Sequence, residues 1–118
     1  MLCYADEQAW EKAGEPARQA AVREAVRLTH ELDGKGQYVL CSRLHPTATA
    51  TSVRVRDGKP LVTDGPFAET REQLGGFYLI EANDLGEIIG MAARHAAVSR
   101  GTVEIRPLLE IPGFPAGK

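Results

Sequence analysis

An aspartate ahead of a Gly-Pro-Phe sequence is the most distinctive chemical feature of the chain. Asp64 follows a short apolar run and precedes Gly65, Pro66 and Phe67. Two roles fit its carboxylate. It could orient a ligand or act as a general base at the mouth of a pocket whose apolar surface raises its pKa. Alternatively, it could accept backbone N–H bonds and fix the turn. Phe67 is expected to form a wall of the core or of the pocket.

His45 is the histidine best placed to form an acid–base pair with Asp64. It ends a predicted strand just before Pro46, and an imidazole changes its protonation near neutral pH. The chain order allows the two side chains to meet but does not require it, so a surface or turn histidine is the alternative. His30 and His95 fall on predicted helices, where neither needs a function. The spacing of the three histidines predicts no metal site.

Polar side chains on both sides of Asp64 extend the candidate ligand site. Glu69 and Thr70 follow the turn and could line a pocket for a polar ligand, although such residues are also typical of a solvated loop. Arg54 lies on the preceding hairpin, where it could bind an anion or keep an edge strand from pairing with other molecules. The predicted ligand-binding set is therefore Asp64, Phe67, Glu69, Thr70 and Arg54, with Asp64 and His45 as candidate catalytic groups.

The composition is that of one ordinary globular domain. We expect the domain to span residues 1–110 and to be followed by a loosely ordered tail, residues 111–118, with two prolines and two glycines. A net charge of -2 argues against direct nucleic-acid binding. The apolar runs are too short for a membrane span, and the absence of a signal peptide favours the cytoplasm. Cys3 and Cys41 form no disulfide framework, and no motif indicates a cofactor or metal.

Periodicity predicts two helices and several strands. The first helix begins near Pro16, ends near Gly34 and carries an apolar stripe of Ala21, Ala25, Leu28 and Leu32. The second begins at Asn83 or Asp84, with a face of Leu85, Ile88, Ile89, Ala92, Ala93 and Ala96. Asp57-Gly58 predicts a two-residue turn in a hairpin over 52–63. Other strands are expected over 2–4, 37–44, 77–81 and 103–106, and residues 47–52 are expected to be extended.

This order predicts an α+β fold, a ferredoxin-like βαββαβ sandwich with an inserted β-hairpin. Two helices can cover only one face of the sheet. The continuous apolar runs 38–41 and 77–80 also direct side chains to the other face. An uncovered apolar face predicts a partner, and a twofold homodimer is the simplest one.

Four segments of the chain resemble the DGPF-domain family, a branch of the YCII-related proteins. They are residues 51–60, 63–70, 72–78 and 103–107, and the resemblance extends over nearly the whole chain. It implies a dimeric α+β barrel in which the sheets of two chains pack together. The chain departs from the family pattern at His95, where an apolar residue is more usual.

The resemblance leaves two functions open. Relatives of this family occur beside or joined to alternative sigma factors, which implies a regulatory accessory protein with a sigma-factor partner and a small-molecule ligand. The wider barrel group includes enzymes acting on cyclic or aromatic compounds, and YCII relatives are linked to a His–Asp pair. That implies a cofactor-free enzyme, with Asp64 and His45 performing acid–base isomerisation or elimination. Contact between these two side chains would favour the enzyme.

Overall fold

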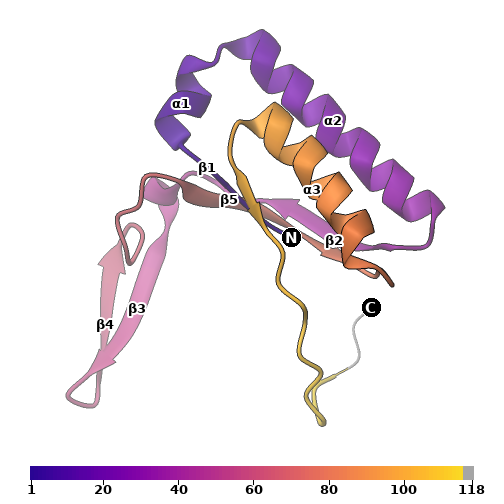
Figure 1. Cartoon of the computed structure of the whole chain (residues 1–118). Helices are drawn as coiled ribbons and strands as arrows, with labels where there is room; N and C mark the ends of the chain where they lie inside the picture. Colours follow the sequence, from indigo (N-terminus) through magenta and orange to yellow (C-terminus); the bar gives the residue numbers. More distant parts are fainter. Residues whose placement is uncertain (116–118) are drawn as a thin grey trace.

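The computed structural model describes residues 1–115 of the chain (Figure 1). Its elements, in chain order, are β1 (Leu2–Ala5), α1 (Glu7–Lys12), α2 (Glu15–Gly34), β2 (Tyr38–Arg43), the short 3₁₀ helix η1 (Thr47–Thr49), β3 (Thr51–Arg56), β4 (Lys59–Asp64), β5 (Gln73–Ile80), α3 (Leu85–Ser99) and β6 (Thr102–Glu104). None of the helices within residues 1–115 has the length and hydropathy needed to cross a membrane.

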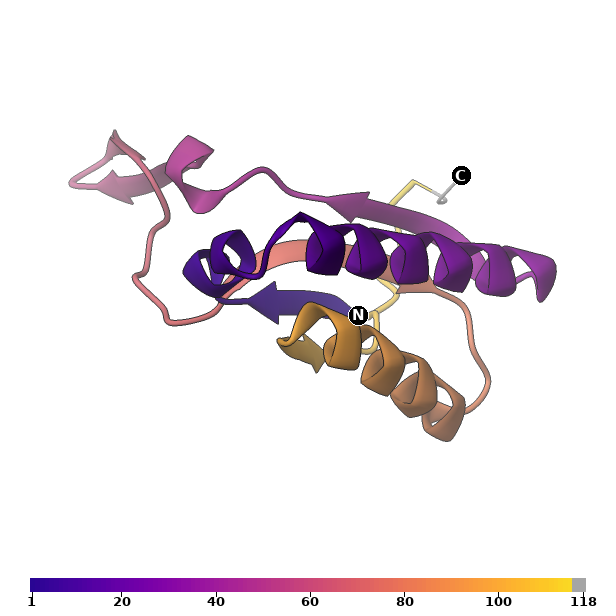
Figure 2. The ribbon, with the colours of Figure 1, turned by 90° about the horizontal axis from the view of Figure 1, so that it is seen from above.

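Four strands form one antiparallel sheet in the order β2-β5-β1-β6. The short strand β1 therefore lies inside the sheet, where Cys3 pairs with Gly76 of β5 and with Val103 of β6. Helices α2 and α3 lie together over one face of this sheet (Figures 1 and 2). The predicted α+β fold with an inserted hairpin is confirmed, because β3 and β4 interrupt the chain between β2 and β5.

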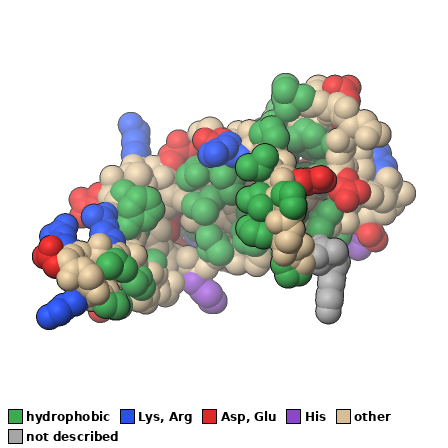
Figure 3. All heavy atoms as spheres, turned by 90° about the horizontal axis from the view of Figure 1, so that it is seen from below, with side chains coloured by type: hydrophobic (Ala, Val, Ile, Leu, Met, Phe, Trp, Pro, Cys, Tyr) green, Lys and Arg blue, Asp and Glu red, His purple; other side chains and the backbone are tan. Residues whose placement is uncertain are grey.

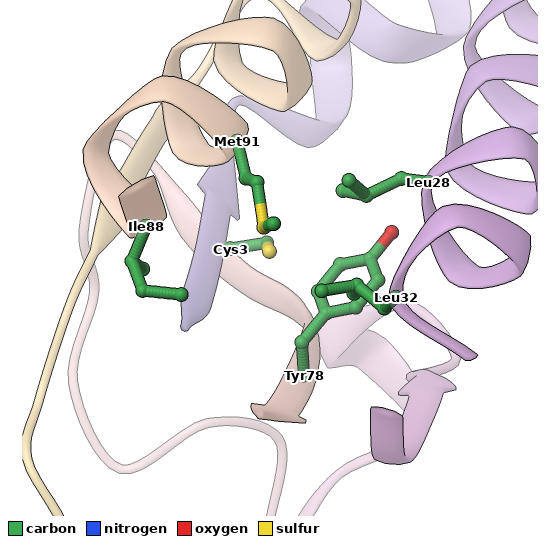
Figure 4. Packing of buried hydrophobic residues seen from close by; sticks show 6 residues of the cluster. All are labelled: Cys3, Leu28, Leu32, Tyr78, Ile88 and Met91. Carbon is green, nitrogen blue, oxygen red and sulfur yellow. The ribbon is translucent and has the colours of Figure 1, made fainter. Parts of the chain in front are cut away.

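The core lies between the helices and the sheet. Ala21, Leu28 and Leu32 are the buried residues of α2, so its predicted apolar stripe is confirmed at these positions. Cys3 of β1 and Tyr78 of β5 meet them from the sheet (Figure 4). The predicted face of α3 is confirmed at Ile88 and Ala92 but wrong at Leu85 and Ile89. The buried residues of this helix are Ile88, Met91 and Ala92, whereas Leu85 and Ile89 are 61% and 53% exposed.

Strands β3 and β4 form a separate two-stranded arm, residues 51–64, which projects away from the main sheet (Figure 1). The predicted turn is confirmed, since Asp57 and Gly58 both have positive φ values, 53° and 74°. This is the geometry of the two-residue turn that matches the twist of a hairpin. Cross-strand pairing of Val53 with Val62 and of Val55 with Pro60 puts an apolar surface on one side of the arm.

The segment before the arm is not extended as expected. Thr47–Thr49 form a 3₁₀ turn, closed by the backbone N–H of Thr49 donating to the carbonyl of Pro46 at 2.9 Å. The carboxylate of Glu7 also accepts hydrogen bonds from the N–H and the hydroxyl of Thr47, at 2.8 and 3.0 Å. Because Glu7 is distant in the chain from Thr47, the local alternation of Thr and Ala could not indicate the bonds between them.

The side of the sheet opposite the helices is uncovered. Side chains alternate along a strand, so Leu40 and Leu79, which pair next to the half-buried Cys41 and the buried Tyr78, point to this open face. Leu2 and Phe77 form a second apolar pair on the same face. Hydrophobic side chains gather across this side of the molecule (Figure 3). Leu40 is 47% exposed, so within one chain β2 is covered on only one face.

The predicted C-terminal tail is described in part. Residues 111–115 contain a turn in which the N–H of Phe114 donates to the carbonyl of Ile111 at 3.3 Å. The remainder of the predicted tail, 116–118, lies outside the described residues.

Candidate functional site

A cavity of about 240 Å³ opens between the helix layer and the sheet, at the end of the sheet near α1. Apolar and thiol side chains form much of its wall, among them Ala21, Val22 and Cys41. The groups that could do chemistry come from five parts of the chain. They are Trp10 of α1, Arg43 of β2, His45 after β2, Tyr78 of β5 and His95 of α3.

Tyr78 and His95 form the polar contact at the inner end of this cavity. The Tyr78 hydroxyl lies 3.5 Å from His95 Nδ1, and the rings meet edge to face with centroids 5.5 Å apart. The Tyr78 ring projects from β5 into the space beneath the helices, beside Leu28 and Leu32 (Figure 4). Burial raises the pKa of Tyr78 and lowers the pKa of His95. At neutral pH the pair is therefore an uncharged phenol beside an uncharged imidazole.

Arg43 and Trp10 form the outer part of the cavity. The guanidinium carbon of Arg43 lies 5.1 Å from the centroid of the Trp10 ring, a cation–π geometry. The positive charge of Arg43 adds to the larger effect of burial in lowering the pKa of His95, whereas for Tyr78 it weakly opposes the burial that raises the pKa. The guanidinium therefore lies near enough to influence the inner polar pair.

Helix α1 is fixed by three contacts, and these hold Trp10 in place. The carboxylate of Asp6 caps the helix by accepting from the N–H groups of Gln8 and Ala9, at 2.9 and 3.3 Å. The N–H of Glu7 donates to Gln73 Oε1 at 3.0 Å, which ties the helix to the start of β5. The bonds from Thr47 to the Glu7 carboxylate tie it to the chain after β2.

The two cysteines contribute apolar volume rather than nucleophiles. Both line the cavity, Cys3 from β1 and Cys41 from β2. Burial raises the pKa of Cys3 to about 11 and also raises the pKa of Cys41. The thiolate is the reactive form, so both side chains are unreactive thiols at neutral pH.

The sequence-predicted ligand residues lie elsewhere, on the arm and the loop that follows it. Asp64, Glu69, Thr70 and Arg54 are exposed, and none of them lines the cavity. The expectation that Phe67 forms a wall of the core or of a pocket is wrong for the single chain, where it is 77% exposed. The arm carries this loop away from the helix layer. One contact does link the set, since Arg54 donates to the Phe67 carbonyl at 3.4 Å.

The turn at Asp64 is held by groups other than its carboxylate. The N–H of Gly65 donates to the Ala50 carbonyl at 2.7 Å, and the Ser52 hydroxyl donates to the Gly65 carbonyl at 2.8 Å. Gly65 has a φ of 92°, a conformation that favours glycine. Within residues 1–115 no hydrogen bond or ion pair joins Asp64 to His45, and His45 alone of the two lines the cavity. The same residues contain no group of three or more potential ligands suited to a metal ion.

His95, like Trp10, Arg43 and Tyr78, lines the cavity but was not among the residues predicted for the site. The buried residues of α3 are Ile88, Met91 and Ala92, and continuing their spacing by three residues reaches His95. This stripe was visible in the sequence, but Leu85 and Ile89 suggested a different face. The departure from the family pattern at His95 was a second signal.

Burial of His95 predicts an acid-sensitive contribution to stability. The pKa of this histidine is lowered in the folded protein from its ordinary value near 6.5. Its unprotonated form is favoured by folding, so its stabilising contribution is complete above about pH 6.5 and is lost as pH falls toward the folded-state pKa. Between pH 7 and pH 5, the wild-type protein should lose more unfolding free energy than His95→Gln, as measured by urea denaturation. His30→Gln, at an exposed position of α2, is the control, and equal losses in wild type and His95→Gln would contradict the assignment.

Comparison with known proteins identifies the family. The model of the YCII-related domain matches residues 1–112 of the chain. The chain is also similar to an uncharacterised protein of Rhizobium meliloti (strain 1021). The two are 38% identical over an alignment of 113 residues that covers 92% of this chain and 89% of the relative. The chain therefore belongs to the family of YCII-related domain proteins.

Proposed function

We propose that the protein is a homodimer that binds a small ligand in the cavity between its helices and its sheet. The observation that carries this proposal is the convergence of Trp10, Arg43, Tyr78 and His95 on one cavity of about 240 Å³. Small-molecule sites are typically concave and largely apolar, with a few polar groups that fix the orientation of the ligand. Residues from four separate elements meet at this one concave place, and that supports a binding role.

Two features of the single chain support the homodimer. The open face carries the apolar pairs Leu40–Leu79 and Leu2–Phe77. The radius of gyration is 16.4 Å, whereas a compact chain of this length is expected to have about 13.5 Å. In the proposed dimer the open faces of two ferredoxin-like sheets pack together as an α+β barrel. Twofold symmetry makes each face its own complement.

The arm, residues 51–64, gives the proposed dimer a second contact. A two-stranded hairpin is at best marginally stable alone, and the exposed side chains Val53, Val55 and Val62 provide an apolar surface for a partner chain. Any ligand contacts of the arm and its loop would then lie beside the partner chain rather than at the cavity of their own chain. The residues concerned are those predicted for ligand binding, Asp64, Phe67, Glu69, Thr70 and Arg54. The sigma-factor partner implied by the family resemblance stays a prediction.

Filling the cavity tests the binding function. Ala21 is 7% exposed and lines the cavity, so Ala21→Leu adds three carbon atoms into that space. Compounds from a panel of small acids, phenols and amides that raise the thermal midpoint of the wild-type protein should lose most of that effect in Ala21→Leu. Ala20→Leu makes the same change at the neighbouring exposed position and should keep the effect. The proposal fails if no compound stabilises the wild type, or if both variants respond alike.

A cofactor-free acid–base enzyme is the second candidate, and the Tyr78–His95 contact is the observation that favours it. An uncharged imidazole can accept a proton while a neighbouring phenol donates a hydrogen bond, and both groups face the cavity. This pair would take the roles first considered for Asp64 and His45. Incubating each stabilising compound with the protein and following it by NMR separates the candidates. Conversion indicates an enzyme, and unchanged spectra indicate binding alone.

A further inference from the structure

The cavity contains a fixed positive charge that lacks a carboxylate partner. Within residues 1–115, the side chain of Arg43 forms no ion pair and no hydrogen bond. Its guanidinium nevertheless has a defined position, because the Trp10 ring lies 5.1 Å away. Stacking on an aromatic ring leaves the N–H groups at the edge of the guanidinium able to bind an anion.

Two carboxylates, those of Glu7 and Glu11, also line the cavity, but neither forms an ion pair with Arg43 within residues 1–115. Both oxygens of Glu7 already accept hydrogen bonds from Thr47, at 2.8 and 3.0 Å. Glu11 is exposed on α1 and forms no ion pair within the described residues. His45 lines the same cavity as Arg43 and offers a second donor. Arg43 and His45 are therefore the donors of the cavity mouth that remain for an anionic ligand.

The remaining wall suits an uncharged, apolar group. Cys3, Cys41 and Ala21 line the cavity, and its volume of about 240 Å³ is smaller than the roughly 300–1,000 Å³ typical of sites for drug-sized ligands. The Tyr78 hydroxyl and the His95 imidazole, 3.5 Å apart, could contact one polar substituent at the inner end. A cavity with a cation at one side and an apolar wall at the other suits an amphipathic anion. Its volume suits an anion about the size of a single ring.

We propose that the ligand is a small organic anion whose carboxylate binds Arg43 and His45 and whose ring or short apolar body enters the space between the helices and the sheet. This inference rests on the ligand-binding function proposed above. Arg43 would determine specificity for the charge of the ligand. The two cysteines, Ala21 and Val22 would limit the size of the ligand.

Three probes of similar shape and different charge test the proposal: benzoate, benzamide and benzylamine. Titration calorimetry with the full-length protein should show that benzoate binds at least about tenfold more tightly than either of the others. Arg43→Gln should weaken benzoate binding by about tenfold or more, because the loss of one charge-assisted contact is worth at least this factor. It should weaken benzamide binding much less, because benzamide carries no charge. Benzoate affinity should also fall as salt is raised, as expected for an exposed charge pair.

Matched variants separate this inference from the broader function. Arg56→Gln removes a charge from the arm and should leave benzoate binding unchanged, while Arg43→Lys should retain part of it. Thermal unfolding of unliganded Arg43→Gln checks that this variant is folded. If benzamide or benzylamine binds as well as benzoate and Ala21→Leu abolishes that binding, the anion inference is wrong and the binding function stands. If benzoate binds equally to wild type and Arg43→Gln, or binds to neither, the anion inference is overturned.

Discussion

Leu40→Glu should convert the protein from a dimer to a monomer at micromolar concentration. Leu40 is 47% exposed in the single chain and points to the open face of the sheet beside Leu79. In the proposed dimer this position is buried, and moving an unpaired carboxylate into an apolar interface costs several kcal/mol. Twofold symmetry introduces the charge twice per dimer. Dissociation should therefore become at least about 100-fold easier, since each 1.4 kcal/mol changes the equilibrium tenfold.

Sedimentation equilibrium of wild type and variants at several protein concentrations measures this effect. Ile89→Glu is the matched control, because Ile89 is 53% exposed on α3 rather than on the open face. The control should dimerise like the wild type. A wild-type protein that is monomeric at micromolar concentration would contradict the dimer. Unchanged dimerisation of Leu40→Glu would show instead that the contact uses another surface.

Gly101→Ala should be the most damaging of the small substitutions in the sheet. A Cβ atom at this position would overlap the carbonyl oxygen of Tyr4 and lie 2.9 Å from its carbonyl carbon. These are backbone atoms of β1, so no side chain can rotate away, and β1 and β6 would have to separate. Forcing extra atoms into packed structure typically costs about 1–3 kcal/mol, and we expect the upper part of this range.

Gly90→Ala provides the comparison and should change the free energy of unfolding in the opposite direction. Gly90 lies within α3, and a Cβ there would meet no atom within 4 Å. Alanine is favoured over glycine inside a helix by about 1 kcal/mol, so this variant should be more stable than the wild type. Urea denaturation at one fixed protein concentration measures both, because association also affects the midpoint. Similar midpoints for the two variants would contradict the packing around Gly101.

The features predicted best from the sequence depend on residues close together in the chain. Asp57-Gly58 predicted the hairpin turn because both residues tolerate positive φ. Asp84 predicted the start of α3, where its carboxylate accepts from the N–H of Gly86 at 2.9 Å. Gly90 and Gly101 show the limit of such reasoning. The sequence places Gly90 inside a helix and Gly101 after it, but it gives no sign of the approach of Tyr4 that makes Gly101 intolerant of a Cβ atom.

The candidate site was harder to predict because its residues are far apart in the chain. Asp64 attracted attention through its local motif, but the arm carries it away from the cavity. Trp10 and Arg43 have no local signature, and they meet His95 only through the packing of α1, β2 and α3. His95 was also masked by Leu85 and Ile89, which imitate a buried stripe while remaining exposed. The apolar open face was predicted correctly because it depends only on alternation along strands.

The position of β1 inside the sheet determines the order in which the fold can be completed during synthesis. Leu2–Ala5 leave the ribosome long before their neighbours, and the strand pairs first with β5 and then with Thr102–Glu104 of β6. Such pairings close nearly the whole chain into a loop, which slows folding. The arm, by contrast, can pair as soon as residues 51–64 are made. The nascent chain therefore leaves one edge of β1 unpaired until almost the last residues of the domain have emerged.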